Sequence, residues 1–234
     1  MNFFAKIKQK IAKQRRIKWI LKEYEKTIFL LSPDNFVDRN ILFEGGYENF
    51  QRDFFYSCLR KYNCEVLLDI GSNFGLYSLT AAKNIDNLKE VHSFECDKRN
   101  YSHLWANIRL NDLYNKITPH FLAVGESSRE VNFVQASEKN TGTSRIDKSG
   151  EVTVNQVSLD GYLDVRSRAG VKIDVEGAEL NVLLGMKAWL SSDLLKVIQI
   201  EIFEHNFEKV VNLLEIYGFK KTAKFEFDYI FEKL

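Results

Sequence analysis

The stretch EVLLDIGSNFGLYSLTAAKN, residues 65–84, decides the fold class because it joins an apolar run to a helical pattern through a glycine turn. Residues 65–70 predict a strand, and residues 73–84 predict a helix. Gly71 permits a sharp turn out of the strand, and we expect Gly75 to let a ligand approach the first turn of the helix. A strand, a glycine turn and a helix in this order are typical of an open α/β sheet that binds nucleosides.

The same alternation continues to the end of the chain. Further strands are predicted over residues 90–95, 117–124, 130–136, 151–159, 171–175, 196–203, 219–227 and 229–234, of which 130–136 and 151–159 are short. Further helices are predicted over residues 99–112, 178–190 and 206–218. Strands that alternate with helices indicate an α/β fold with a mostly parallel, doubly wound, Rossmann-like sheet. The last two strands have no helix between them, so they predict an antiparallel hairpin at the edge.

Composition narrows the class of protein. A chain of 234 residues with 45% hydrophobic residues is long enough for one large α/β domain and an appendage. Its three cysteines form no CxxC pair, which argues against a disulfide framework and a zinc site. No apolar run approaches the roughly 20 residues that cross a bilayer. We therefore expect a cytoplasmic protein.

The charge is concentrated at the N-terminus. Residues 1–26 hold nine Lys or Arg and two Glu, a net charge of +7, so the rest of the chain carries −6 of the total of +1. Apolar residues recur near helical spacing among these lysines, so we predict a basic helical extension over residues 1–44 and a catalytic domain over residues 45–234. The apolar stripe of the extension either packs on the catalytic domain or, through residues 1–26, contacts the inner face of the membrane. Binding of nucleic acid by the extension is less favoured.

Acidic residues end the first two predicted strands, where an open parallel sheet binds its ligands. Glu95 can accept hydrogen bonds from two ribose hydroxyls. A dinucleotide fingerprint requires glycine where this chain has Asn73, and the chain lacks a triphosphate-binding GxxxxGK[ST] loop. Asp69, beside a helix N-terminus, suits a zwitterion such as the methionine part of S-adenosylmethionine, and Glu48 is a second candidate for its ammonium group.

The segment VKIDVEGAEL, residues 171–180, places three acidic side chains at one junction of strand and helix. If S-adenosylmethionine is the cofactor, we expect Asp174 to point at its methyl group, to orient an acceptor hydroxyl and to take the proton of that hydroxyl. Glu176 and Glu179 follow it closely, and Glu179 is expected to be a stabilising charge at the start of the helix.

Other candidates lie nearby in the predicted sheet. Glu201 ends the neighbouring strand and is expected to face Asp174; two such carboxylates could hold a divalent cation, although the reaction does not require one. His205 is an alternative catalytic base. Lys172 is unusual within an apolar strand and either ends at the site or reaches the surface. The polar loop over residues 138–150 either folds over the bound substrate, with Arg145 in contact with substrate or cofactor, or is a surface loop.

These segments together resemble the FkbM family of S-adenosylmethionine-dependent methyltransferases over about residues 45–203. The resemblance runs through LLDIGSNFGLYSL, SFECDKRNYSHLWANIRLN, FLAVGESS, GTSRI, VSLDGYL and VKIDVEGAELNVLLGM. It implies the Rossmann-like class I methyltransferase fold, S-adenosylmethionine as cofactor and methylation of a hydroxyl on a small molecule, sugar or glycan. Cys96 stands where the family commonly has proline.

The positions that match the family, together with the predicted strand ends, give the expected site residues. The expected cofactor-binding residues are Asp69, Gly71, Ser72, Asn73, Gly75, Glu95, Cys96, Ala123 and Asp174. The expected catalytic residues are Asp174, Glu201 and His205, and Arg145 and Glu176 are expected to contact the substrate. No resident metal is predicted.

Three other functions remain open. A methyltransferase acting on the 2′-hydroxyl of RNA could use the basic N-terminus to hold phosphates. A non-catalytic module tethered to a membrane would not need Asp69, Gly71, Glu95 and Asp174 together. An NAD-dependent dehydrogenase is disfavoured by Asn73.

Overall fold

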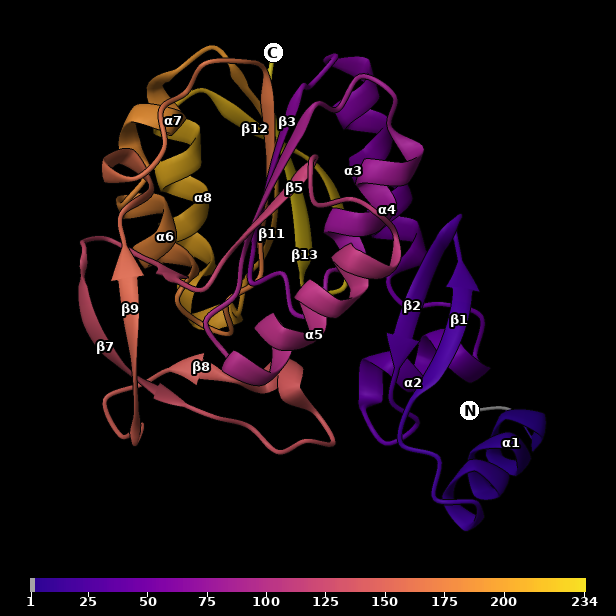
Figure 1. The fold of residues 1–234 in the computed structure, drawn as a ribbon. Coiled ribbons are helices and arrows are strands. Elements are labelled where there is room, and N and C mark those ends of the chain that lie inside the picture. Colours follow the sequence, from indigo (N-terminus) through magenta and orange to yellow (C-terminus); the bar gives the residue numbers. More distant parts are fainter. Residues whose placement is uncertain (1–2) are drawn as a thin grey trace.

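The computed structural model describes residues 3–234, apart from the side chains at positions 3–5 and 13, and its centre is a seven-stranded sheet (Figure 1). The strands lie in the order β12-β13-β11-β10-β3-β4-β5. Their bounds are β3 (Val66–Ile70), β4 (Glu90–Phe94), β5 (Ile117–His120), β10 (Ala169–Ile173), β11 (Leu195–Glu201), β12 (Phe219–Phe225) and β13 (Asp228–Lys233). The five strands from β11 to β5 are parallel, and β12 and β13 form an antiparallel edge hairpin. The predicted fold class is confirmed.

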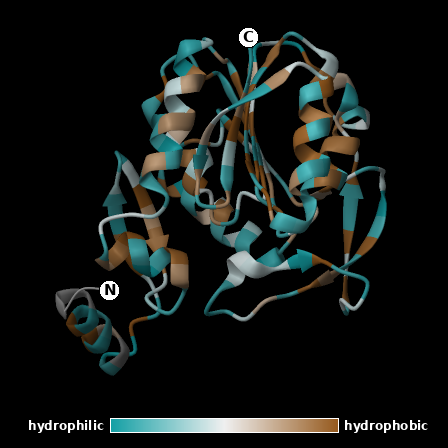
Figure 2. Ribbon diagram, turned by 180° about the vertical axis from the view of Figure 1, so that it is seen from behind, coloured by the Kyte–Doolittle hydropathy of each residue, from teal (hydrophilic) through white to brown (hydrophobic). Residues whose placement is uncertain are grey.

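Helices cover both faces of this sheet (Figure 1). One layer holds α3 (Asn49–Lys61), α4 (Leu76–Asn84) and α5 (Lys98–Leu110), and the other holds α6 (Glu179–Leu184), α7 (Lys187–Ser191) and α8 (Phe207–Ile216). Their hydrophobic sides face the sheet in Figure 2, and each layer shares a buried apolar cluster with it. The single helix predicted over residues 178–190 is wrong, since α6 ends at Gly185, whose missing side chain lets the backbone of Gly125 approach.

Strand alternation places a polar row on the face that α3 and α4 cover. Leu68, Val171 and Ile198 point to the opposite, apolar cluster. Their neighbours Asp69, Lys172 and Gln199 lie in register across β3, β10 and β11, and all three are buried. Because successive side chains of a strand point to opposite faces, the polar row follows from the sequence period.

A second, four-stranded sheet lies across the carboxyl ends of the parallel strands (Figure 1). It consists of β6 (Ala123–Val124), β7 (Arg129–Val134), β8 (Arg145–Ile146) and β9 (Val152–Val157), in the order β6-β9-β7-β8. The predicted strand over residues 117–124 is therefore wrong as one element. Its first half is β5, and its second half, β6, pairs with β9 instead.

The N-terminal segment is only partly helical. It forms α1 (Phe3–Gln14), the strands β1 (Ile20–Tyr24) and β2 (Thr27–Leu31), and α2 (Phe36–Phe43). Within the predicted helical extension, α1 and α2 are helices, but the prediction is wrong for residues 20–31, which form an antiparallel hairpin. Glu25 and Lys26, which join its strands, both have positive φ, as a two-residue type I′ turn requires.

This hairpin is part of the main hydrophobic core. Phe29 and Leu31 are completely buried in the cluster that includes α3 and α4. Side chains of α5 complete the edge of β2: Asn107 accepts the N–H of Leu30 at 2.8 Å, and Asn111 accepts the N–H of Ile28 at 2.9 Å. The division into residues 1–44 and 45–234 stays a prediction, but its boundary does not separate two cores. Over residues 3–234, the structure contains no helix with the length and hydropathy of a membrane span.

Candidate active site

Two adjoining cavities open where the parallel strands end. The β4 cavity is lined by residues after β3 and β4 and by the second sheet, among them Phe94, Glu95, Cys96, Leu122, Ala123, Phe133, Ser144, Arg145 and Ile146. The α2 cavity is lined by residues of α2, α4 and the strand ends, among them Phe36, Tyr47, Glu48, Ser72, Phe74, Tyr77, Lys172 and Glu201. Gly71, Asn73, Gly142, Asp174 and Glu176 line both.

Glu95 is the polar anchor of the β4 cavity. Its two carboxylate oxygens accept the backbone N–H groups of Asn73, at 2.9 Å, and of Asp97, at 2.7 Å. Burial raises the pKa of Glu95 to about 7. Each oxygen retains a free acceptor position, so the carboxylate can also receive ribose hydroxyls. The apolar walls from Phe94, Leu122 and Ile146 suit a flat base beside that ribose.

Two turn glycines serve different contacts. Gly71 has φ +80°, and a Cβ there would lie 1.7 Å from the carbonyl oxygen of Asp174. The ends of β3 and β10 can therefore meet only if residue 71 is glycine. Gly75, with φ +93°, faces the side chains of Leu79 and Leu104. The expected ligand approach at Gly75 is thus replaced by packing of α4.

Asp69 has a supporting position instead of the expected contact with the ammonium group. It is completely buried, and its Oδ2 accepts the N–H of Ser78, in the first turn of α4, at 3.1 Å. Its Oδ1 lies 4.0 Å from Nζ of Lys172. The positive end of α4, which was expected to face a carboxylate of the cofactor, is therefore already satisfied by a carboxylate of the protein.

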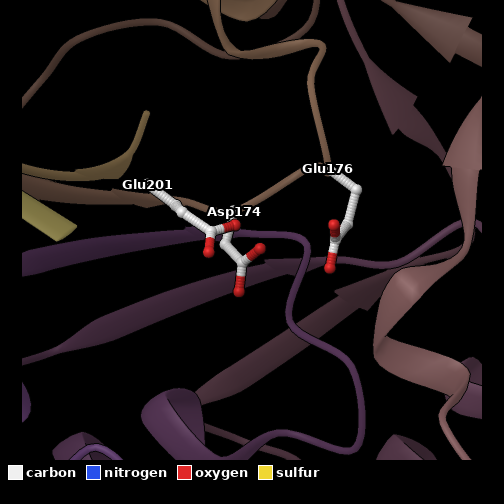
Figure 3. Close-up of side chains that lie close together, drawn as sticks. All are labelled: Asp174, Glu176 and Glu201. Atoms are coloured by element: carbon white, nitrogen blue, oxygen red, sulfur yellow. The ribbon is translucent and has the colours of Figure 1, made fainter. Parts of the chain in front are cut away.

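Three carboxylates converge at the junction of the cavities. Asp174 and Glu176 follow β10, Glu201 ends β11, and each offers an oxygen within 4.8 Å of the others (Figure 3). The expectation that Asp174 faces Glu201 is confirmed. Burial, followed by repulsion from Asp174, raises the pKa of Glu201 to about 9 and that of Glu176 to about 7. Such a group attracts cations, and its oxygens are of the type that a divalent cation binds.

Lys172 lies beneath this acidic group. Its Nζ donates hydrogen bonds to Oδ2 of Asp174 at 3.0 Å and to the carbonyl of Gly71 at 3.2 Å. It also lies 5.2 Å from the ring centre of Tyr77. Burial alone would lower the pKa of Lys172, but attraction to Asp174 and Asp69 outweighs it and raises the pKa. Lys172 thus ends at the site and does not reach the surface.

A hydrogen-bonded chain joins the wall of the α2 cavity to β11. Gln199 donates to the hydroxyl of Tyr77 at 2.8 Å, and that hydroxyl donates to Glu48 at 3.0 Å. Burial and the nearby Asp228 raise the pKa of Glu48 to about 7. The sequence reasoning missed Tyr77, Gln199 and Asp228. The signal that could have found Gln199 is its polar character within an apolar strand, in the same alternation as Lys172.

Three other predicted residues occupy three different positions. His205 is exposed in the short turn Glu204–Asn206 after β11, and its ring stacks on Phe203 at 6.4 Å; the structure does not bring it to the three carboxylates. Glu179 lies in the first turn of α6, as predicted; it is completely buried and accepts the N–H of Gly177 at 2.8 Å, so it also braces the loop after β10. Arg145 lines the β4 cavity, on the predicted cofactor side.

The chain matches the model of a known protein family. The model of the methyltransferase FkbM domain matches residues 69–221, which is more than half of the chain. The chain belongs to the FkbM methyltransferase family. S-adenosylmethionine is therefore its cofactor, and the buried carboxylate, apolar walls and glycine turn of the β4 cavity fit an adenosine group.

Two relatives illustrate the range of the family. Hexuronic acid methyltransferase AglP from Haloferax volcanii is 28% identical over 131 residues, covering 55% of this chain and 52% of that protein. The chain thus spans about half the length of the curated relative it matches. The crystal structure of methyltransferase FkbM from Methylobacillus flagellatus superposes with a TM-score of 0.54 at 18% identity, covering 73% of this chain and 44% of that one. This second likeness supports the fold.

Proposed function

We propose that the chain transfers a methyl group from S-adenosylmethionine to a hydroxyl of a neutral sugar or glycan, with Asp174 as the proton acceptor. The observation that carries this proposal is the position of Asp174, which lines both cavities and is the point where they join. A group at that point can contact an acceptor hydroxyl in the α2 cavity while the nucleoside of the cofactor occupies the β4 cavity.

The residues of the β4 cavity would hold the nucleoside. Glu95 would accept the ribose hydroxyls, and Phe94, Leu122 and Ile146 would enclose the base. Glu48, in the α2 cavity, is the candidate partner for the ammonium of the methionine part, because a buried carboxylate gains most from a cation. When bound, S-adenosylmethionine supplies the methyl group from its positively charged sulfonium centre.

Asp174 and Lys172 would act on the acceptor hydroxyl. Lys172 fixes one oxygen of Asp174 through the 3.0 Å hydrogen bond. The other oxygen can accept a hydrogen bond from the hydroxyl, align its lone pair with the methyl carbon and take the proton as the hydroxyl becomes acidic. Lys172 is a positioning residue in this scheme, because it acts through Asp174.

The charge of the α2 cavity favours a neutral acceptor. Glu48, Asp174, Glu176 and Glu201 line it, and Lys172 is the one cation among its lining residues. Burial raises the pKa of Glu48, Glu176 and Glu201 because further negative charge is costly there, so an acceptor that adds a negative charge, such as RNA or a sugar with its own carboxylate, is disfavoured. Phe36 is partly exposed and packs edge-on against Tyr47 at 6.2 Å, which offers an apolar face to a sugar ring. The relative AglP is named for a hexuronic acid, which carries a carboxylate. For this chain, the α2 cavity favours a neutral acceptor instead.

The test combines binding and turnover. Calorimetry with S-adenosylhomocysteine is expected to show binding to the wild type, roughly tenfold or greater weakening for Glu95→Gln, which loses a charged hydrogen bond, and little change for Asp174→Asn. Formation of S-adenosylhomocysteine with methyl glycosides of neutral hexoses is expected to fall by about 10²–10⁴ in kcat for Asp174→Asn.

Two results would contradict the proposal. Unchanged turnover in Asp174→Asn would remove Asp174 from the chemistry. Methyl glucuronide turned over faster than the neutral glycosides would refute the charge argument for the acceptor, while leaving the cofactor site intact.

A further inference from the structure

The N-terminal surface is strongly basic. Residues 6–22 contain eight Lys or Arg and no Asp or Glu. All of the basic side chains that the structure describes in this stretch are exposed, namely Lys6, Lys8, Lys10, Arg15, Arg16, Lys18 and Lys22. None of them is needed for the site at the strand ends. This surface therefore has a charge that the methyl transfer does not explain.

Exposed apolar side chains are interleaved with these charges. Ile7 and Ile11 lie one turn apart on α1 and are 40% and 44% exposed. Trp19, just before β1, is 50% exposed, and Leu21, within β1, is 60% exposed. On α1, Ala12 is buried, and α1 packs against α2. The apolar stripe of α1 is thus not used up by packing on the domain.

The hairpin extends the same apolar surface. Leu21 pairs with Leu30 and Glu23 pairs with Ile28, so these four side chains share the face of the hairpin opposite to Phe29 and Leu31. Ile28 is 42% exposed on that face. The apolar residues of α1, of the connecting segment and of the hairpin thus lie within one short stretch of chain, flanked by cations. We call residues 6–28 the N-terminal patch.

We propose that the N-terminal patch binds the surface of a bilayer that contains anionic phospholipids. Cations attract the headgroups, while Trp19, Leu21 and the isoleucines enter the boundary with the acyl chains, which is the pattern of interfacial helices. A second copy of the chain fits poorly, because two such patches would bring their positive charges together. Nucleic acid fits poorly as well, because its phosphates offer no partner to the exposed isoleucine and leucine side chains.

The N-terminal patch lies close to the acceptor side of the site. α2, against which α1 packs, contributes Phe36 and Val37 to the lining of the α2 cavity. A protein bound through this patch would therefore hold its α2 cavity near the bilayer. The proposal itself does not depend on the identity of the acceptor.

Sedimentation with lipid vesicles tests the proposal on the full chain. Vesicles of phosphatidylcholine with 30% phosphatidylglycerol are expected to bind the protein at 100 mM NaCl, and vesicles of phosphatidylcholine alone are not. Lys8→Glu with Lys10→Glu is expected to weaken binding by roughly tenfold or more, since each basic residue near the surface contributes substantially. Trp19→Ala with Leu21→Ala is expected to weaken it at high salt as well.

The matched control is Lys209→Glu with Lys220→Glu, which changes the net charge equally at exposed positions of α8 and β12. This variant is expected to bind like the wild type. Equal loss of binding in this control, or no vesicle binding by the wild type, would overturn the proposal. A patch variant that binds vesicles normally but loses binding to a 20-nucleotide RNA, or that changes the protein from dimer to monomer, would also overturn it and assign the patch to that other partner.

Discussion

The two cavities of the site are built by different means. The β4 cavity is formed by the ends of adjacent strands and by backbone contacts, such as those of Asn73 and Asp97 with Glu95. The α2 cavity is formed by charged side chains from distant parts of the chain, where Lys172 supports a group of carboxylates that repel one another. The first cavity depends on backbone shape, and the second on a balance of charge.

This difference indicates what a substitution near each cavity should impair. A change of backbone shape near β3 should affect folding and cofactor binding together. A change of charge near β10 and β11 should affect catalysis and pH dependence while the fold remains, because a buried carboxyl can take up a proton when its partner is lost.

The largest effect is expected for Gly71→Ala. The new Cβ would lie 1.7 Å from the backbone oxygen of Asp174, so β3 and β10 would have to separate at the site. We expect a melting temperature lower by about 10 °C, from roughly 4 kcal/mol of lost stability, and loss of S-adenosylhomocysteine binding, measured by scanning fluorimetry and calorimetry.

Gly177→Ala is the matched control for Gly71→Ala. Gly177 also has positive φ, +103°, but a Cβ there meets no atom within 4 Å. Only the backbone strain of about 1–2 kcal/mol should remain. If both variants lose the same stability, close contact between the strand ends is not what requires Gly71.

An intermediate effect is expected for Lys172→Met, which keeps much of the side chain's volume and removes its charge. Asp174 would lose the hydrogen bond at 3.0 Å, and the surrounding carboxyls would lose their nearest cation. We expect kcat to fall by about 10- to 100-fold at pH 7 and to recover partly as the pH is raised, because carboxyls without the cation ionise at higher pH.

Lys172→Arg serves as the charge-conserving comparison. It should retain the wild-type pH profile, even if its larger head group lowers kcat. A Lys172→Met variant whose kcat falls equally at every pH would show that Lys172 has only a packing role, and the charge balance assigned to the α2 cavity would then be wrong.

The two cavities also differ in how well the sequence predicted them. Gly71, Asn73, Glu95, Cys96 and Ala123 lie within short segments whose strand ends are readable, and the structure brings all five to the β4 cavity. Asp174 and Glu201 were predicted to face each other because neighbouring parallel strands end at the same edge.

The rest depended on tertiary packing. Tyr77 and Phe36 read as ordinary apolar residues of a helix, and only the docking of α2 and α4 brings them to the cavity. His205 looked suitable because it follows β11, but the turn after that strand leaves it exposed. Asp69 looked like a ligand-binding residue because the sequence could not show that Ser78 satisfies it from within α4.

The smallest effect is the pH dependence of stability without cofactor. Burial raises the pKa of Glu48, Glu95 and Glu176 to about 7, above the value of about 4.5 expected for the unfolded chain. The folded state therefore binds more protons between these two values, so these groups make it less stable as the pH rises from about 4.5 to 7. Glu201, with a pKa of about 9, extends the loss to higher pH. We expect the melting temperature of the free protein to fall by several degrees from pH 5 to pH 8.

Cofactor should reverse this trend, because positive groups favour the ionised carboxylates; the stabilisation by S-adenosylmethionine should therefore increase from pH 6 to pH 8. Most of the titrating carboxyls belong to the α2 cavity. Glu48→Gln with Glu201→Gln should consequently flatten the pH dependence of the free protein more than Glu95→Gln does, since glutamine does not titrate. Scanning fluorimetry across this range measures all three proteins. If the melting temperature of the double variant changes with pH as steeply as that of the wild type, the carboxyls that cause the pH dependence lie outside the α2 cavity.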